Sequence, residues 1–360
     1  MLLIPTQLGR HFWPEFALLK GIRIDYLAPT VYLIDVVVVG LIITRIKLIK
    51  ELKLLKRQKI IGIFFLINIL VSQNKWLAGI GWIRVAEIYL IYLILKDEKE
   101  LLRKYLKSII PFWIIMEAML GLMQIAKGGS LQGIFYWLGE RRFNLNTIGV
   151  AKISWWGEEM VRAYGTFSHP NSMAGFLLVA LELWKNYKKD LWYWIVRWMG
   201  VVGVMITASR VAILLLPIYL WPILLIFSGW DSLSLVKRMQ LNWEALKMFL
   251  KHPLFGVGIN NYLVHSRYFQ PVHNVYLLIL SEIGIVPISF KLIKLLKLLR
   301  RNIRNKVFWI ILITGLVDHY WVTLPQNWWL MTVILSLSNH KIQIARNKLK
   351  YFICNLGIGY

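Results

Sequence analysis

The feature that most constrains the fold is a series of apolar, almost uncharged segments that recurs along the chain. Several reach about 17–20 residues, the length that an α-helix needs to cross the hydrocarbon core of a bilayer. Hydrophobic residues make up 58% of the sequence, more than the roughly 45–50% of soluble domains. The alternating short segments of a β-barrel are not seen. The sequence therefore predicts an all-α polytopic membrane protein, a bundle of about ten transmembrane helices. The predicted segments are 29–45, 60–73, 78–95, 106–126, 170–186, 191–208, 211–228, 274–290, 307–322 and 327–339.

Basic residues account for a net charge of +25 and fall in blocks between the apolar segments. Seven lysines and arginines lie in each of the ranges 45–59 and 291–306, and five lie in 96–107. Nucleic-acid binding would need such residues on a separate soluble module with aromatic side chains, so we expect no nucleic-acid partner. Blocks of this kind are typical of cytoplasmic loops. The predicted localisation is a multi-pass protein of the inner or plasma membrane, with the lipid bilayer as a partner.

Residues 1–360 are expected to form a single integral membrane domain with two long polar connections, 127–169 and 229–273. An odd number of crossings separates the first from the cytoplasmic blocks, which predicts an external loop. The second is external only if 211–228, which contains Pro217 and Pro222, enters and leaves on the same side. We therefore expect a broken hairpin at 211–228. Within the second loop, 236–251 is expected to form an amphipathic helix.

A polar run precedes the apolar segment 170–186 and suggests a site for an anionic ligand. Pro170 suits the first turn of a helix, and Ser168 or His169 would cap it. The N-terminus of such a helix attracts phosphate, and Gly165 would let the backbone approach a ligand closely. Arg162 opens the run. An ordinary capped helix start is the alternative interpretation.

Arg210 lies between two apolar segments, where an ionisable residue is a functional candidate and a guanidinium matches phosphate oxygens. An arginine at the lipid interface is the alternative. His273 precedes a predicted segment and could take a proton from a hydroxyl, although a structural hydrogen bond would explain it as well. Asp318, inside a predicted segment, needs a partner, for which we expect a lysine or arginine. Arg84 and Glu87 are expected to form a structural pair.

No metal and no other cofactor is expected. His252, His265 and His273 lack the spacing of three or four residues that would place metal ligands together on a helix, and Cys354 is the single cysteine.

Four motifs occur in order along the chain: Arg162–Ala174, Thr207–Arg210, Pro253–Gly258, and His273–Asn274 followed by Glu282–Gly284. Together they resemble the O-antigen ligase/polymerase family of polytopic glycosyltransferases. The opening segment Gly21–Asp35 also resembles N-terminal segments of some members, so the resemblance covers most of the chain.

The resemblance implies a GT-C-like helical fold with a long external loop, and a donor in which undecaprenyl diphosphate carries an oligosaccharide. The glycan would pass to a hydroxyl of a glycan, lipid or protein acceptor on the external face, without a metal. Arg210 and Arg238, together with Arg162, would hold the diphosphate, and His273 would orient or deprotonate the acceptor hydroxyl. The remaining residues expected to line the cavity are His169, Asn171, Asn274, Glu282 and Asp318.

Two other functions fit parts of the pattern. A transporter or flippase of a lipid-linked glycan would also use arginines and a broken helix, but it should show inverted repeats and a charge cluster at the midplane, which the sequence lacks. A non-catalytic membrane scaffold is the third interpretation.

Overall fold

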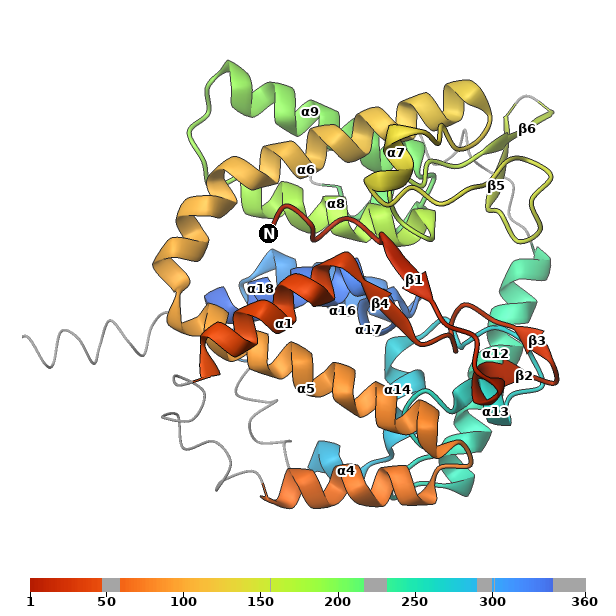
Figure 1. Ribbon diagram of the computed structural model, residues 1–360. Coiled ribbons are helices and arrows are strands. Elements are labelled where there is room, and N and C mark those ends of the chain that lie inside the picture. Colours follow the sequence, from red (N-terminus) through yellow and green to blue (C-terminus); the bar gives the residue numbers. More distant parts are fainter. Residues whose placement is uncertain (47–58, 156, 217–231, 290–299, 301, 339–360) are drawn as a thin grey trace, which may run out of the picture.

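Helices that run side by side form most of the protein, and short strands and loops gather at one end of them, on the right in Figure 1. The computed structural model describes residues 1–46, 59–155, 157–216, 232–289, 300 and 302–338. The longer helices are α1 Leu33–Thr44, α4 Lys59–Val71, α5 Lys75–Asp97, α6 Lys99–Lys127, α8 Pro170–Trp184, α9 Leu191–Ile206, α12 Ser232–Lys251, α14 Val275–Ile283, α16 Lys306–Gly315 and α18 Pro325–Ser338.

Short elements connect these helices. The short helices are the 3₁₀ helix η1 Glu15–Ala17, α7 Ile134–Trp137, α10 Arg210–Leu214, α13 Tyr262–His265 and α17 Tyr320–Thr323. The strands pair antiparallel in two-stranded sheets, in which β1 Gly9–His11 pairs with β4 Thr30–Tyr32, β2 Leu18–Leu19 with β3 Ile22–Arg23, and β5 Lys152–Trp155 with β6 Glu158–Val161. Strands within the described residues contradict the all-α prediction.

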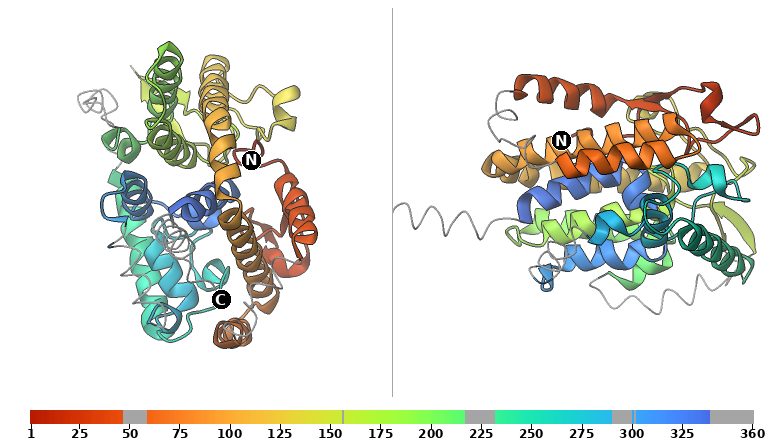
Figure 2. Two further views of the ribbon diagram at one scale, coloured as in Figure 1. Left: turned by 90° about the vertical axis from the view of Figure 1, so that its left-hand side faces the viewer. Right: turned by 90° about the horizontal axis from the view of Figure 1, so that it is seen from below.

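The core lies around α8, which packs against α6, α9, α16 and α18. Twelve of its fifteen residues are buried. A helix that is apolar on all sides in this way belongs to a protein interior or a membrane, and here neighbouring helices cover it. Gly203 of α9 permits close approach, because a Cβ atom there would contact Leu177 of α8 and Ala118 of α6. Figure 2 shows these helices from two further directions.

The prediction of about ten transmembrane helices is wrong. Within the described residues, two helices, α5 and α6, are long and apolar enough to cross a membrane by length and composition, and these two alone do not establish a multi-pass protein. Apart from 211–228, the prediction read every apolar segment as a crossing. Several of them are instead shorter helices, and α8 is apolar because the protein itself buries it.

Two predicted segments are interrupted. Segment 274–290 contains α14, which ends at Gly284 with φ of 77°. Segment 307–322 is divided into α16 and α17, with Asp318 between them. These interruptions place polar residues at helix ends inside the protein.

Other predictions have mixed outcomes. The helix expected at 236–251 is confirmed as α12. Residues 217–228 of the expected broken hairpin lie outside the described residues, as do most of the basic blocks 45–59 and 291–306, and Cys354. Nothing in the fold tests on which side of a membrane 127–169 and 229–273 lie.

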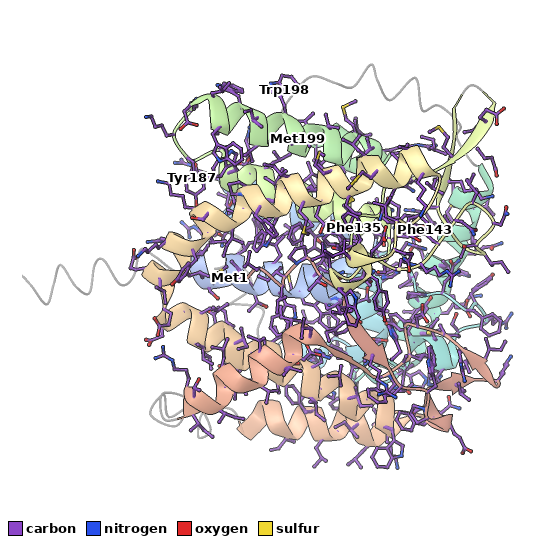
Figure 3. The ribbon with its side chains drawn as sticks, turned by 45° about the horizontal axis from the view of Figure 1, so that its top comes forward. Met1, Phe135, Phe143, Tyr187, Trp198 and Met199 are labelled. Carbon is purple, nitrogen blue, oxygen red and sulfur yellow. The ribbon has the colours of Figure 1, made fainter. Side chains whose placement is uncertain are left out.

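Peripheral helices carry apolar side chains on their outer faces. On α9, Leu191 is 78% exposed and Trp198 is 54% exposed, and Figure 3 shows Trp198 at the outer edge of the molecule. On α1, Val36 is 61% exposed. Ile63 and Leu66 of α4 are each 57% exposed. Apolar faces of this kind mark surfaces that contact a protein or a lipid.

Candidate functional site

Polar side chains from distant parts of the sequence meet around Asp318, in the link between α16 and α17. Asn171, in the first turn of α8, donates its Nδ2 to Asp318 Oδ2 at 2.8 Å. His273, before α14, places its Nδ1 3.5 Å from Asp318 Oδ1. Arg162, which follows β6, donates to Asn171 Oδ1 at 2.6 Å. We call Arg162, His169, Asn171, His273, Asp318 and His319 the Asp318 cluster.

The start of α8 supplies two members of the cluster. Pro170 occupies the first turn and His169 is the N-cap, as the sequence predicted, with His169 Nδ1 accepting from the backbone N–H of Asn171 at 3.2 Å. Because Nδ1 accepts a hydrogen bond, a neutral His169 carries its proton on Nε2. The cap thereby fixes His169 and directs Asn171 between Arg162 and Asp318.

Arg162 is held by neutral groups. Its Nε donates to the carbonyl oxygen of Thr207 at 2.6 Å, and its second bond goes to the amide oxygen of Asn171. Burial is the main reason that the pKa of Arg162 falls to about 10; Tyr164 and Asp318 oppose this shift, and the positive charges of Arg238 and Arg210 add to it. The three arginines that the sequence assigned to a diphosphate therefore lie within electrostatic reach of one another.

Arg238 reaches the same region from α12. Its guanidinium donates to the carbonyl oxygen of Val317 at 2.7 Å, directly before Asp318. Arg210 opens α10 and is exposed. Arg162 and Arg238 therefore both reach the neighbourhood of Asp318, whereas Arg210 is linked to this region through its electrostatic effect on Arg162.

Asp318 is built to remain ionised. Its Oδ1 accepts from the backbone N–H of His319 at 2.8 Å, in addition to the bond from Asn171. Burial alone would raise the pKa of Asp318. The contact with His273 and the neighbouring imidazoles of His319 and His169 lower it by more, so that it lies well below its ordinary value. The partner expected for Asp318 was a lysine or arginine, whereas the structure provides Asn171 and His273.

Two imidazoles of the cluster are kept neutral. Burial lowers the pKa of His169 to about 3 and that of His319 to about 4, although the charge of Asp318 opposes both shifts. His319 also shares a hydrogen bond of 2.7 Å between its Nδ1 and the hydroxyl of Thr323. The ring centroids of His319 and His273 lie 5.2 Å apart.

Buried polar side chains of α6 hold the turn that carries Arg162, and the sequence interpretation missed them. Glu117 accepts from the N–H of Thr166 at 2.9 Å and from its hydroxyl at 2.7 Å. Gln124 accepts from the N–H groups of Tyr164 and Gly165. A Cβ atom at Gly165, where φ is 57°, would overlap the Glu117 carboxylate. The close approach at Gly165 is therefore to Glu117 and not to a ligand.

The motifs Pro253–Gly258 and Glu282–Gly284 pack against each other through their backbones. Val257 and Gly258 donate their N–H groups to the carbonyl oxygens of Ser281 and Glu282, at 2.9 and 3.0 Å. A Cβ atom at Gly256 would overlap the backbone of Glu282. These glycines thus let the segment 253–258 fold around the end of α14, which fixes the helix that follows His273.

Asn274 and Glu282 have structural partners. Asn274 caps α14 with two hydrogen bonds and donates to the carbonyl oxygen of Leu316 at 3.1 Å. Glu282 is 5% exposed, and one of its oxygens accepts from the N–H of Tyr262 at 3.2 Å and from the hydroxyl of Tyr26 at 3.4 Å. The contacts of Asn274 and Glu282 therefore position α14, and neither residue makes a hydrogen bond within the Asp318 cluster.

A metal could be considered at one place in the described chain. His273, Asp318 and His319 each offer a ligand atom, and these atoms lie within 4.8 Å of one another. Two imidazoles and a carboxylate are common metal ligands. The spacing argument from the sequence did not foresee this set, because its members come from two separate segments. Absence of a metal remains a prediction.

Comparison of the chain with protein-family models, with curated protein sequences and with solved structures gives no match. The resemblance to the O-antigen ligase/polymerase family thus depends on the motifs quoted above.

Proposed function

We propose that the protein is a glycosyltransferase that moves a glycan from undecaprenyl diphosphate to an acceptor hydroxyl. The acceptor belongs to a glycan, a lipid or a protein, and the reaction uses no metal. One observation carries this proposal: guanidiniums held by neutral acceptors lie beside a histidine that faces a buried carboxylate. The guanidiniums suit a diphosphate, and the histidine with its carboxylate suits a hydroxyl nucleophile.

The arginines account for binding and departure of the carrier. Arg162 and Arg238 make their hydrogen bonds to amide or backbone oxygens, so the charge of each is not neutralised by direct contact with a carboxylate. Guanidiniums recognise phosphate oxygens through paired N–H groups. When the glycosidic bond to the diphosphate breaks, its electrons stay with the leaving oxygen, and nearby cations stabilise the charge that develops.

His273 and Asp318 account for activation of the acceptor. With Nδ1 toward Asp318, His273 has Nε2 to accept the hydroxyl proton. The acceptor oxygen forms a bond to the anomeric carbon, the bond from that carbon to the diphosphate breaks, and the proton passes to His273. Asp318 stabilises the imidazolium that results, as a carboxylate does in hydrolase triads. The separation of 3.5 Å is long for a hydrogen bond, and such contacts often tighten when substrate binds.

A membrane location agrees with the apolar faces of α1, α4 and α9 and with the lengths of α5 and α6. A polyprenyl donor can reach the cluster only if the cluster lies near a bilayer surface. We propose that this surface is the external one.

The experiment uses purified protein with undecaprenyl-diphosphate-linked oligosaccharide and EDTA, and measures free undecaprenyl diphosphate and transferred glycan. His273→Gln should reduce product formation by about 10²–10⁴-fold, the usual contribution of a general base. His252→Gln is the matched control, because His252 is exposed at the end of α12 beside His265.

Equal losses in His273→Gln and His252→Gln would contradict the assignment of His273. A wild-type protein that forms no product, yet moves the lipid-linked glycan between leaflets of proteoliposomes, would replace the transferase by the flippase.

A further inference from the structure

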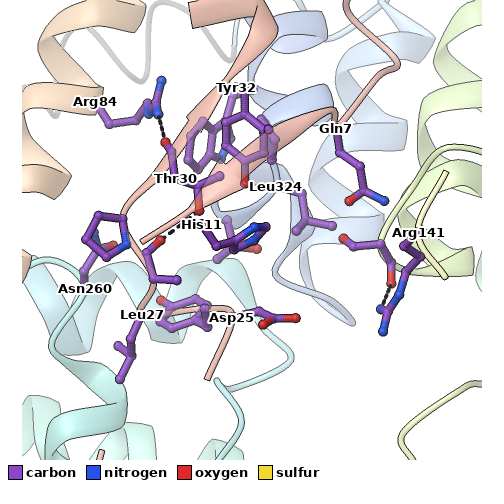
Figure 4. Close-up of a pocket in the computed structure, with 18 of the residues that line it drawn as sticks. Gln7, His11, Asp25, Leu27, Thr30, Tyr32, Arg84, Arg141, Asn260 and Leu324 are labelled. Atoms are coloured by element: carbon purple, nitrogen blue, oxygen red, sulfur yellow. Dashed lines mark hydrogen bonds between the residues drawn. The ribbon is translucent and has the colours of Figure 1, made fainter. Parts of the chain in front are cut away.

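A cavity of about 440 Å³ lies between the N-terminal segment and the ends of α5, α17 and α18. Figure 4 shows Gln7, His11, Asp25, Tyr32 and Arg141 around it. Its volume falls within the roughly 300–1,000 Å³ of small-molecule sites. Of the four motifs that occur in order along the chain, only Arg162–Ala174 contributes to this cavity, through Ser168. The opening segment Gly21–Asp35 lines it with residues 25–30 and Tyr32, and the strands β1 and β4 form one of its walls.

The charges of this lining are balanced. Arg84 and Arg141 face the cavity together with Asp25 and Glu140. The carboxylate of Glu140 already accepts hydrogen bonds from Gln124 and from backbone N–H groups. A diphosphate would be drawn to the arginines around Asp318 and not to this cavity. The balance instead favours an uncharged ligand that both donates and accepts hydrogen bonds.

Aromatic rings and buried donors share the lining. Tyr26, Tyr32 and Trp328 present ring surface. Trp328 Nε1, Gln7 Nε2 and Ser168 Oγ are buried polar atoms with no hydrogen-bond partner among the described residues. Gln7, Ser168 and Trp328 therefore supply polar groups among the side chains that line the cavity. Ring faces beside hydrogen-bonding groups suit a pyranose, which has an apolar face of C–H groups and a rim of hydroxyls.

The cavity adjoins the Asp318 cluster. His319 lines it and stacks edge-on with Tyr26 at 6.4 Å between ring centroids. Arg141 donates to the carbonyl oxygen of Ser168, the residue before His169, at 3.0 Å. The ring of His319 lies 5.2 Å, between centroids, from that of His273, the histidine that the proposed reaction uses.

We propose that this cavity binds the terminal sugars of a neutral oligosaccharide acceptor, so that one hydroxyl reaches His273 while the diphosphate of the donor stays with the arginines. The acceptor role depends on the proposed function. Binding of a saccharide does not, and it is measured separately.

The test measures binding of free oligosaccharides to the full-length protein on an array of neutral bacterial and simple homopolymeric glycans. The strongest binder is then titrated by saturation-transfer NMR. The His273→Gln background excludes turnover. Asp25→Asn and Trp328→Phe should weaken binding about tenfold, the loss expected for one hydrogen bond. Trp329→Phe is the matched control, because Trp329 is adjacent, buried and outside the lining. Asp25 is exposed, so its variant should fold.

The outcomes separate the two proposals. Absence of binding on the whole array, or equal affinities in Trp328→Phe and Trp329→Phe, would overturn the cavity assignment even if transfer occurs. In steady-state transfer, Trp328→Phe should raise KM for the acceptor and leave kcat and KM for the donor unchanged. Saccharide binding without transfer in any preparation would retain the cavity and reject the transferase.

Discussion

Two groups of charged residues in the described part of this protein differ in what their arginines bind. Arg84 of α5 contacts carboxylates, with Asp35 at 2.6 Å and Glu87 at 2.5 Å, and donates to the carbonyl oxygen of Thr30. Arg162 contacts neutral oxygens of Thr207 and Asn171. The first group has two acids for one base. In the second, Asp318 lies near Arg162 and Arg238, which make their hydrogen bonds to neutral oxygens.

The difference indicates which group serves the fold and which serves a ligand. Asp35 and Glu87 neutralise Arg84 within the protein, and Asp35 also accepts from the N–H of Tyr32, which ties β4 to α1. The charges of Arg162 and Arg238 are not neutralised by direct contact with a carboxylate, at an energetic cost that an anionic substrate would remove. The two groups therefore predict different responses to the same substitution.

Among the substitutions that compare the two groups, the largest effect is expected for Arg162→Met. Removing one cation that stabilises a leaving diphosphate should lower kcat by about 10²–10³-fold, equivalent to about 3–4 kcal/mol. The free energy of unfolding should change by only about 1 kcal/mol, because only hydrogen bonds to neutral acceptors are lost. Rate measurements and thermal unfolding of the same preparation test both parts. Loss of stability without loss of rate would assign Arg162 to the fold.

Arg84→Met is the counterpart, with an expected loss of about 3 kcal/mol in stability, since it leaves Asp35 and Glu87 partly buried without their cation. Thermal unfolding gives the loss, and Arg84→Met combined with Glu87→Gln should recover part of it. A double variant no more stable than the single one would show that the carboxylates are not the source of the effect.

The sequence predicted the local parts of both groups. Arg84 and Glu87 are three residues apart on a helix, and the cap formed by His169 before Pro170 needs only neighbouring residues. Apolar length, by contrast, did not separate a membrane-crossing helix from α8, which other helices bury. Hydropathy shows that a segment is shielded from water, but it does not show whether lipid or other helices shield it.

The contacts that position Arg162 were beyond the sequence interpretation because they join distant segments. Glu117 and Gln124 are seven residues apart, and therefore on one face of α6, inside a segment expected to face lipid. Two such polar residues in an apolar segment were a usable signal that one face of α6 packs against polar backbone. Their partners at 164–166 could not be identified without the fold.

The pH dependence of stability should also depend on the Asp318 cluster. In the folded protein the pKa is about 3 for His169 and about 4 for His319, whereas in the unfolded chain both take up protons near 6.5. At these two sites the unfolded state binds more protons below pH 6.5, so their contribution to stability falls as the pH drops from there toward 4. The slope should be roughly 1.4 kcal/mol per pH unit for each imidazole.

Thermal unfolding between pH 7 and 5 measures this slope. His319→Asn, which retains a group able to pair with Thr323, should lower the slope by roughly 1.4 kcal/mol per pH unit, the contribution of one imidazole, and the exposed His252→Gln should leave it unchanged. An unaltered slope in His319→Asn would mean that another group dominates acid sensitivity.

The smallest expected effect is that of chelators. His273, Asp318 and His319 are close enough to hold a metal, but Asp318 already accepts from Asn171 and from the N–H of His319, and His319 pairs with Thr323. The charges of Arg162 and Arg238 would also repel a dication. We therefore expect EDTA to leave transfer unchanged and elemental analysis to find far less than one zinc per chain. Stoichiometric zinc that is lost together with activity in EDTA, and restored with it, would instead place a metal between His273 and Asp318. In that case a metal, and not the arginines alone, would supply the positive charge that a diphosphate needs.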